Sequence, residues 1–403
     1  MAASELSLAW DPEIDTPATI AIVGGGRAGI EAALYARFLG YDVWLFERGR
    51  PGRAWQHVSH VPMSGTWQEE TSPLGRAALE AQGTPLEVEL ASRPTYGEYV
   101  QRYLTPLAKT DLVYDSVQIQ STVRSISRCG IPPGAVVSVQ EAADLEFRVL
   151  VDSVSRGPHC PIVDIVLDCS GLQPVGGLGP GGGWAVGQDR LEPGHLAAQR
   201  GTDHASVVGA AAGGRIVLVG NSAAAIRCAE LLRDCEGDRI QRWTWLLPGR
   251  AGDGQASWAH LPDALAQTAS VLVDRAPSEH WAALEIIGVE RMTQLETGGW
   301  NLELRRRADE TVEIQCDDLI VAPPEWPDWQ ICQPLRESLA EPPDRQADAP
   351  FLTPHPHYYV LGSKADRRAQ KRLARTLDHI RAVFALIGGR RDLDLYQTIH
   401  PRS

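Results

Sequence analysis

The sequence lacks the cysteine pattern that a disulfide framework, a zinc site or a dithiol redox centre would need. Its seven cysteines are an odd number, are scattered over 403 residues and include no Cys-x-x-Cys pair. Paired or closely spaced cysteines mark all three kinds of site. His355 and His357 alternate as in a strand, but no acidic or cysteine partner stands beside them. We therefore expect no disulfide staples, no bound metal and no catalytic dithiol.

Long apolar runs and an excess of positive charge are also absent. Arg215 and Arg227 interrupt the longest apolar candidate, and a membrane span needs roughly 18 to 20 apolar residues. Residues 1–17 carry no Lys or Arg, whereas a secretory or mitochondrial leader needs a basic flank. The 38 basic and 51 acidic residues give a net charge of −13, which repels nucleic-acid phosphates. We expect a cytoplasmic protein that binds neither membranes nor nucleic acid.

Length and composition indicate a globular chain with more than one core. Hydrophobic residues make up 43% and charged residues 22% of the sequence, so no long polar tract is forced into disorder. Single cores seldom grow beyond roughly 250 residues. At least two domains are therefore expected.

The first regular pattern predicts a strand, a tight turn, a helix and a second strand. Residues 19–23 are a β-branched run, residues 24–29 are rich in glycine, and residues 31–39 favour a helix. Residues 42–46 read as the next parallel strand and end at Glu47. This order is a βαβ unit.

The glycine turn of this unit matches the G-x-G-x-x-G pattern of dinucleotide-binding sites. Gly24 permits the tight turn, Gly26 lets the backbone approach a pyrophosphate, and Gly29 lets helix and strand pack closely. The helix N-terminus supplies N–H groups and a positive dipole end. Glu47 is placed to accept hydrogen bonds from a ribose diol. The predicted nucleotide contacts are Gly24, Gly26, Arg27, Ala28, Gly29 and Glu47.

A second βα start follows at residues 215–233, with another strand at 243–247. Gly220 takes the first glycine position of its turn, but Ser222 takes the middle one, which hinders backbone approach to a pyrophosphate. Arg250 is placed to pair with a 2′-phosphate and so favours NADPH over NADH, although an exposed Arg in a Pro-Gly turn is also common. The predicted contacts here are Gly220, Ser222, Ala223 and Arg250.

Three further segments complete a family likeness: residues 46–48 followed by Gly52-Arg53-Ala54-Trp55, the sequence Asp168-Cys169-Ser170-Gly171, and residues 358–364. Together with the two glycine turns, they resemble the FAD-dependent pyridine-nucleotide oxidoreductase superfamily, and within it the flavin-containing monooxygenase branch. The resemblance covers nearly the whole chain, from residue 18 to residue 386. Arg53 stands where the second glycine of the branch's G-G-x-W element is usual.

The resemblance implies an α/β fold with two Rossmann-like dinucleotide-binding domains. A discontinuous FAD-binding domain would comprise residues 17–172 and 323–395, and an NAD(P)-binding-like domain of residues 205–322 would be inserted in it. Residues 122–126 would back the adenine, and the turn at 362–364 would close over the flavin. The FAD contacts implied in this way are Arg48, Arg53, Trp55, Val123, Gly171, Gly362, Ser363 and Lys364.

The function implied is the NAD(P)H-dependent oxygenation of a small organic molecule, by N- or S-oxygenation or hydroxylation, with FAD and, less firmly, NADPH as cofactors. The F-x-G-x-x-x-H linker of flavin monooxygenases is missing, and Ala322-Pro323-Pro324 takes the place of a second A-T-G element. Two alternatives therefore stay open: an FAD-dependent dehydrogenase or oxidase without nicotinamide, and a non-catalytic nucleotide-binding scaffold. The oligomeric state is left open as well.

Candidate catalytic residues come from the polar segment directly after the cofactor loop. A polar segment in a buried cleft needs a reason to be polar. His57, Trp67 and Glu69, with His60 beside them, are the candidates for work near the flavin. The alternative is an ordinary surface loop, where histidines and carboxylates are usual.

Overall fold

The computed structural model describes residues 8–173, 177–197, 214–234, 240–249, 258, 261, 263–274, 281–307, 310–322, 325–336, 338–339, 349–366, 373–390 and 392–399. The chain divides into two compact units. Unit 1 consists of Met1–Ala54, Gly65–Leu172 and Pro327–Ser403, and unit 2 of Trp55–Ser64 and Gln173–Trp326. Residues 55–64, which the sequence-based boundaries place in the first domain, group with unit 2.

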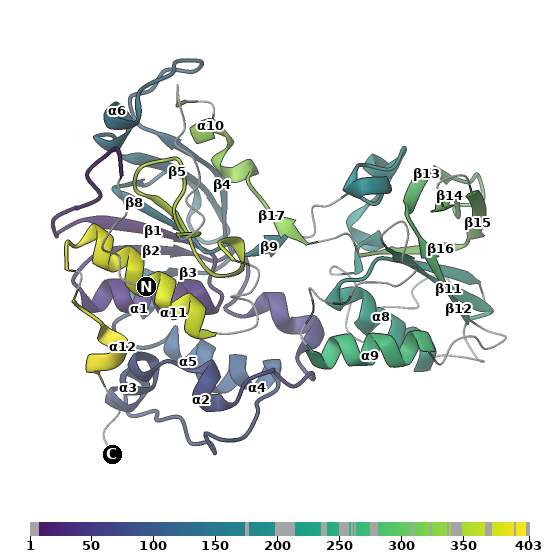
Figure 1. Ribbon diagram of the computed structural model, residues 1–403, viewed down its shortest axis with the longest axis horizontal. Helices are drawn as coiled ribbons and strands as arrows, with labels where there is room; N and C mark the ends of the chain where they lie inside the picture. The colour runs from purple at the N-terminus through teal and green to yellow at the C-terminus, as the bar shows by residue number, and fades with distance from the viewer. Residues whose placement is uncertain are drawn as a thin grey trace. The chain divides into compact units, whose positions relative to one another are not determined.

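A five-stranded parallel sheet with the order β18-β8-β1-β2-β3 forms the centre of unit 1 (Figure 1). Val23 pairs with both Phe46 and Asp168, and Asp168 pairs with Val360, so the carboxyl ends of four strands meet at one edge. The strands are β1 (Thr19–Val23), β2 (Asp42–Phe46), β3 (Val117–Gln118), β8 (Ile165–Asp168) and β18 (Tyr358–Val360).

An antiparallel sheet packs on this parallel sheet. Phe147, Val149 and Val151 are buried on one side of β5 and share a core with Ala21 and Val23 of β1. Its strands are β4 (Ser121–Arg128), β5 (Phe147–Ser153), β6 (Gly157–His159) and β7 (Ile162–Val163).

Residues 162–167 do not form a single strand. The run divides at Asp164, whose side chain accepts the N–H of Thr19 at 2.7 Å. Residues before this point pair with β5, and residues after it pair with β1 and β18. The interruption lets one short segment serve two sheets.

Helices cover the other face of the parallel sheet. The first, α1 (Arg27–Phe38), is buried from Gly29 to Ala36 because it contacts β1 and β2 on one side and α11 (Leu373–Ile387) on another. The helix ends before Gly40, whose φ of +91° suits glycine. The sequence predicts the last helix from residue 366, and residues 367–372 of that prediction lie outside the described part.

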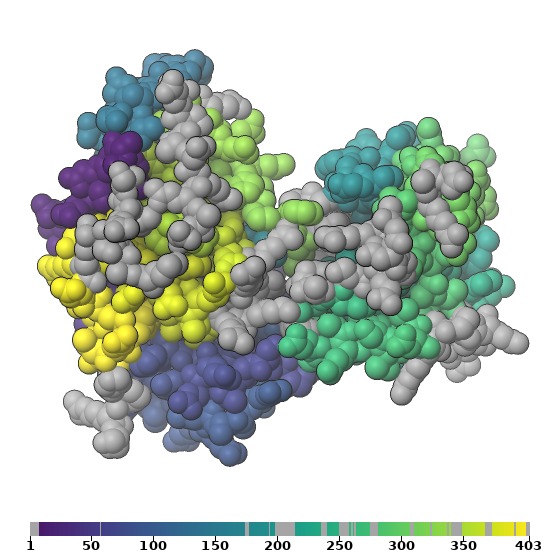
Figure 2. Space-filling model, in the orientation of Figure 1, coloured from purple at the N-terminus to yellow at the C-terminus, as the bar shows by residue number. Residues whose placement is uncertain are grey.

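A layer of short helices between residues 67 and 107 completes unit 1, and on the visible face the C-terminal elements, in yellow, lie next to it (Figure 2). The layer contains α2 (Trp67–Glu70), α3 (Pro73–Ala81), α4 (Tyr96–Tyr99), the π-helix η2 (Val100–Leu104) and α5 (Thr105–Leu107). Shorter elements of this unit are η3 (Tyr114–Ser116), α6 (Val139–Ala143), η9 (Gln330–Cys332), α10 (Gln333–Arg336), η10 (Gly362–Lys364) and α12 (Leu395–Thr398).

Unit 2 repeats the layered arrangement with a four-stranded parallel sheet of order β12-β11-β10-β16. Two helices lie on one face of this sheet and an antiparallel sheet lies on the other (Figure 1). Val219, Leu246, Trp300 and Leu302 are among the residues of the core between the two sheets. The elements are β10 (Arg215–Val219), α8 (Ala223–Asp234), β11 (Arg242–Pro248), α9 (Asp263–Asp274), β12 (Trp281–Ile286), β13 (Gly288–Gln294), β14 (Trp300–Arg307), β15 (Glu310–Cys316) and β16 (Asp318–Val321).

The remaining short elements lie in the chain segments at the unit boundaries and in the segment that leads to β10. They are η1 (Arg53–Val58), β9 (Leu172–Gln173), η4 (Pro180–Gly182), η5 (Gln188–Arg190), η6 (Pro193–His195) and β17 (Trp326–Pro327). The predicted α/β class with two parallel sheets is confirmed. None of the helices in the described ranges is long and apolar enough to cross a membrane.

Candidate functional site

The three glycines of the G-x-G-x-x-G pattern in the first turn have different surroundings. Gly24 has a φ of +101°, and a Cβ added to it would lie 2.7 Å from the carbonyl oxygen of Cys169. A Cβ on Gly29 would overlap the carbonyl oxygen of Gly24. A Cβ added to Gly26, in contrast, would have no described atom within 4 Å apart from those of Gly26 and its neighbours in the helix and the chain. Packing inside the protein therefore explains Gly24 and Gly29, while Gly26 borders open space.

That open space lies at the N-terminus of α1. Gly26 is the N-cap residue, and no described side chain caps the helix there. The first hydrogen bond of the helix is made by the N–H of Ile30 to the carbonyl of Gly26, at 3.0 Å. The preceding N–H groups of a helix have no intrahelical acceptor, and the dipole adds positive potential. This arrangement suits an anion such as a phosphate.

Glu47 links this turn to the loop that follows β2. One carboxylate oxygen accepts the N–H of Gly25 at 2.7 Å, and the other accepts the N–H of Gly49 at 2.6 Å. Each carboxylate oxygen has a second lone pair that remains able to accept a hydroxyl. The carboxylate is therefore held in place at the edge of the sheet, where the sequence predicts a ribose contact.

Two more predicted turns lie at the same edge of the parallel sheet. Gly171 has a φ of +70°, and a Cβ added to it would lie 3.3 Å from the hydroxyl oxygen of Ser363. Gly362 has a φ of +66°, and a Cβ added to it would lie 2.9 Å from the Cβ of Ala28. The turn at 24–29 therefore lies next to the turns at 169–171 and 362–364, and these two also lie next to each other. The three turns come from distant parts of the chain.

Lys364 follows the last of these turns and is fully buried. Its ammonium lies 2.5 Å from a carboxylate oxygen of Asp168, and both side chains have 0% exposure. Sequence reasoning predicts Lys364 as a flavin contact and misses Asp168 as its partner. The interruption of the apolar run 165–167 by an aspartate was the available signal.

Arg27 is paired inside unit 1 as well. The residue is 7% exposed, and its guanidinium lies 2.5 Å from a carboxylate oxygen of Glu70. The other oxygen of Glu70 accepts the N–H of Gly65 at 3.2 Å. Burial raises the pKa of Glu70, and the neighbouring Arg27 opposes that rise. Arg27 therefore ties the end of α2 to the glycine turn at the start of α1 through its side chain.

The remaining FAD contacts implied by the resemblance differ in exposure. Arg48 and Arg53 are exposed, and Trp55 is half-buried in η1, in a segment of unit 2. Val123 is 8% exposed and packs in the core between the two sheets of unit 1. Its side chain supports the packing of the two sheets, and its contact with FAD remains a prediction.

The candidate catalytic residues have structural contacts of their own. Trp67 is 3% exposed and stacks on Tyr99, with 6.3 Å between ring centroids. Glu69 accepts the N–H of Thr66 at 2.8 Å and forms a capping box at the start of α2. The sequence Thr-x-x-Glu is the signal for this box. The catalytic roles of Trp67 and Glu69 remain predictions that none of these contacts supports.

The two histidines of the same segment belong to unit 2. His57 lies in η1, and its side chain is outside the described part of the structure. The Nε2 atom of His60 lies 3.5 Å from a carboxylate oxygen of Glu230, on α8. His57 remains a prediction, and His60 has a carboxylate partner in its own unit.

The turn of the second βα unit differs from the first. Gly220 has a φ of +126°, and a Cβ there would overlap the carbonyl oxygen of Ala322. Its own carbonyl accepts the indole N–H of the buried Trp245 at 2.8 Å. The hydroxyl of Ser222 accepts the N–H of Ala225 at 3.4 Å, so the start of α8 carries a side-chain cap. The start of α1 has none.

The other predicted contacts of this turn are less informative. Ala223 is the first residue of α8. Arg250, predicted to pair with a 2′-phosphate, lies outside the described residues. The preference for NADPH over NADH therefore rests on the sequence alone.

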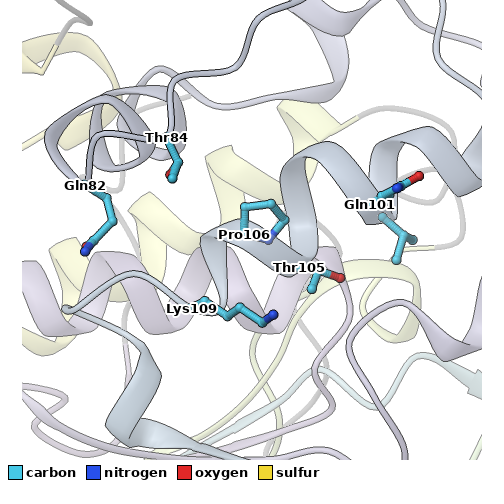
Figure 3. A pocket seen from close by; sticks show the side chains of 7 residues that line it. Gln82, Thr84, Gln101, Thr105, Pro106 and Lys109 are labelled. Atoms are coloured by element: carbon cyan, nitrogen blue, oxygen red, sulfur yellow. The ribbon is translucent and has the colours of Figure 1, made fainter.

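An open pocket lies on the helical layer of unit 1 (Figure 3). Val100 lines this pocket. Its side chain also lies close to Gly52, in the loop after β2, where an added Cβ would overlap it. Lys109 is the charged residue of its lining. The lining consists of Gln82, Thr84, Val100, Gln101, Thr105, Pro106 and Lys109. Since these include none of the predicted nucleotide contacts, the carboxyl edge of the parallel sheet is the better candidate site.

No protein-family model matches the sequence, and no curated protein matches it. Solved structures do match along nearly the whole chain. DfoA bound to FAD, the desferrioxamine-pathway cadaverine monooxygenase from Erwinia amylovora, is 11% identical with a TM-score of 0.63, covering 96% of this chain and 99% of that chain. The chain shares the fold of this oxidoreductase.

Two further matches extend the likeness. The reduced form of ornithine hydroxylase PvdA from Pseudomonas aeruginosa is 16% identical with a TM-score of 0.59, covering 95% of this chain and 99% of that chain. Bacillithiol disulfide reductase Bdr from Bacillus cereus is 14% identical with a TM-score of 0.58, with the same two coverages of 95% and 99%. The resemblance inferred from the motifs is confirmed at the level of the fold.

Proposed function

We propose that this chain binds FAD in unit 1 and is an FAD-dependent oxidoreductase. The observation that carries the proposal is the turn at Gly26, where open space meets an uncapped helix N-terminus. A glycine that no neighbour in the described structure requires is explained if a pyrophosphate approaches the backbone there. The confirmed likeness of fold to an FAD-bound monooxygenase supports the same conclusion.

The residues of this edge fit the parts of FAD. The N–H groups at the start of α1 would bind the pyrophosphate, and the fixed carboxylate of Glu47 would accept the hydroxyls of the adenosine ribose. The touching turns at Gly171 and Gly362 would enclose the flavin end. FAD supplies the electron chemistry when bound, and the protein orients it and excludes water.

For the reaction we propose the NAD(P)H-dependent oxygenation of a small organic molecule. Two of the matched structures are named as a monooxygenase and a hydroxylase. A third is named as a disulfide reductase, but this sequence has no Cys-x-x-Cys pair, and its described cysteines are free thiols. Oxygenation is therefore preferred to dithiol chemistry.

A second candidate function is substrate oxidation by FAD without a nicotinamide cofactor. The hydroxyl of Ser222 already accepts an N–H at the start of α8 and occupies the place of the middle glycine. A phosphate that binds there has to displace this cap. If this second candidate is correct, we therefore expect weak or absent nicotinamide binding.

One spectroscopic experiment tests both candidates. The purified protein is scanned from about 350 to 500 nm, and NADPH or NADH is then added without oxygen. A yellow protein that NADPH or NADH bleaches supports the oxygenase proposal. A yellow protein that only an organic substrate bleaches supports the second candidate. A colourless protein that gains no thermal stability from added FAD contradicts both and favours a non-catalytic scaffold.

Two substitutions at Ser222 test whether its side chain limits nicotinamide binding. Ser222→Gly removes the hydroxyl and opens the turn, so we expect tighter NADPH binding and faster anaerobic bleaching of the flavin. Ser222→Ala removes the cap but keeps a Cβ, so we expect a loss of about 0.5 to 2 kcal/mol in stability and no such gain. Equal NADPH affinity in Ser222→Gly and the natural protein would show that the cap is irrelevant.

A further inference from the structure

The ion pair of Asp168 and Lys364 lies at the carboxyl edge of the parallel sheet, fully withdrawn from solvent. One oxygen of Asp168 accepts the N–H and the hydroxyl of Ser170, at 3.1 and 2.6 Å. The other oxygen accepts the hydroxyl of Tyr358 at 2.5 Å and the ammonium of Lys364 at 2.5 Å. All four contacts of this carboxylate are therefore made within the protein.

The ammonium of Lys364 is equally occupied. It donates to Asp168, to the carbonyl of Asp328 at 2.5 Å and to the hydroxyl of Ser170 at 3.3 Å. A lysine has three N–H donors, and these acceptors use all of them. The ring of Trp329 covers the ammonium, with 4.6 Å to its centroid. No donor of Lys364 is left for a ligand, so direct hydrogen bonding to FAD does not explain this residue.

A pair of this kind is costly to bury. Replacing a buried ion pair by well-packed apolar groups is often neutral or stabilising, because desolvation offsets the attraction between the charges. What the pair does provide is geometry. It ties the end of β8 to β18, to the turn at 362–364 and to the segment at Asp328 and Trp329, where the chain re-enters unit 1. Asp168 stands three residues before Gly171 in the chain, and Lys364 stands two residues after Gly362.

We propose that Asp168 and Lys364 are positioning residues for the flavin end of the FAD site. The pair holds the turns at Gly171 and Gly362 in contact, and its two charges compensate each other, so that it adds no net charge beside the flavin. This inference rests on the proposed FAD binding. It assigns to Lys364 an indirect role in place of the direct contact that the sequence suggests.

A cycle of three variants tests the proposal: Lys364→Met, Asp168→Asn and the two combined. Lys364→Met leaves an unpaired buried carboxylate and Asp168→Asn an unpaired buried ammonium, so each single variant loses thermal stability. The double variant has no unpaired charge and keeps the side-chain volumes close to the natural ones. It therefore folds even where a single variant does not. Arg306→Met combined with Glu310→Gln removes an exposed ion pair of unit 2 and is the matched control.

The measurements are the unfolding temperature of each apoprotein, the FAD dissociation constant at a temperature where all variants are folded, and the midpoint potential of bound flavin. We expect the double variant to unfold near the natural temperature but to bind FAD at least about tenfold more weakly. We expect Asp168→Asn to raise the midpoint potential and Lys364→Met to lower it, with the double variant close to the natural value. The control pair changes none of the three quantities.

The possible failures are distinguishable. If the natural apoprotein does not bind FAD, the proposed function fails and this inference falls with it. If the natural protein binds FAD and the double variant binds it equally well, the pair is only structural and the inference alone fails. If the double variant keeps the potential of Lys364→Met, the ammonium acts on the flavin directly, and the charge-compensated positioning role is overturned.

Discussion

Glu31 lies within α1 with a carboxyl group that is 0% exposed. Burial raises its pKa to about 7 from the ordinary value of 4.5, although the hydroxyl of Tyr103 donates to it at 2.6 Å and opposes the rise. Ser72 from the start of α3 and the charges of Arg27 and Arg76 also oppose it. The second oxygen of Glu31 has no hydrogen-bond partner among the described residues. The folded protein therefore keeps a proton on Glu31 that the unfolded chain releases.

This proton makes stability depend on pH. Between pH 4.5 and about 7 the folded state binds more protons than the unfolded chain, so the free energy of unfolding falls as pH rises and then levels off. The fall amounts to about 3 kcal/mol. Glu31→Gln imitates the protonated acid and has no such slope. Urea unfolding at pH 5, 6, 7 and 8 measures this. Glu141→Gln, in an exposed capping box, is the control, and equal slopes for Glu31→Gln and the natural protein would refute the assignment.

The turn before α1 is the element on which the proposed FAD site depends. Gly29 is required by packing, whereas Gly26 has a φ of −78° that any residue adopts and borders open space. The two positions therefore separate the stability of the element from its binding function. Gly40, which ends the same helix with a φ of +91°, is required by conformation alone.

Alanine at Gly26 and at Gly29 should have different effects. Gly26→Ala is expected to change apoprotein stability by less than about 1 kcal/mol but to weaken FAD binding at least about tenfold, because its Cβ enters the space of the phosphate. Gly29→Ala is expected to lower stability strongly, since its Cβ overlaps the carbonyl of Gly24. Thermal unfolding of the apoproteins and FAD titration measure both effects. Unchanged FAD affinity in Gly26→Ala would contradict the site.

At the scale of the whole molecule, each unit has its own parallel sheet and its own core. A ligand that binds one unit stabilises that unit's native state by mass action, by about 2.7 kcal/mol at 100 times its dissociation constant. FAD should therefore slow amide exchange in β1, α1 and β2 of unit 1. The antiparallel strands β13, β14 and β15 of unit 2 should keep their exchange rates.

Hydrogen exchange with and without excess FAD, followed by peptide mass analysis, checks this expectation. NADPH is the comparison ligand, because binding at the second turn would protect β10 and α8 instead. Protection by FAD confined to unit 2 would reverse the assignment of the two turns.

Local pattern was enough to predict much of the architecture. The β-branched run at residues 19–23, the glycine turn and the helix after it are confirmed, because strand and helix periods and turn glycines are properties of neighbouring residues. The same holds for the second βα start at residues 215–233. The capping box of Glu69 was equally local and readable from Thr66.

The sequence by itself determined the two βα units, the α/β class and the position of the glycine turns, since each depends on a few adjacent residues. Only the tertiary structure decided which charges are paired. Asp168 and Lys364 are 196 residues apart, and the partners Arg27 and Glu70 are 43 residues apart. No periodicity connects such positions. Asp168 and Lys364 meet because parallel strands bring their carboxyl ends to one edge, and Arg27 and Glu70 meet because the tertiary fold brings the end of α2 to the start of α1. In both places burial makes pairing of the charges obligatory.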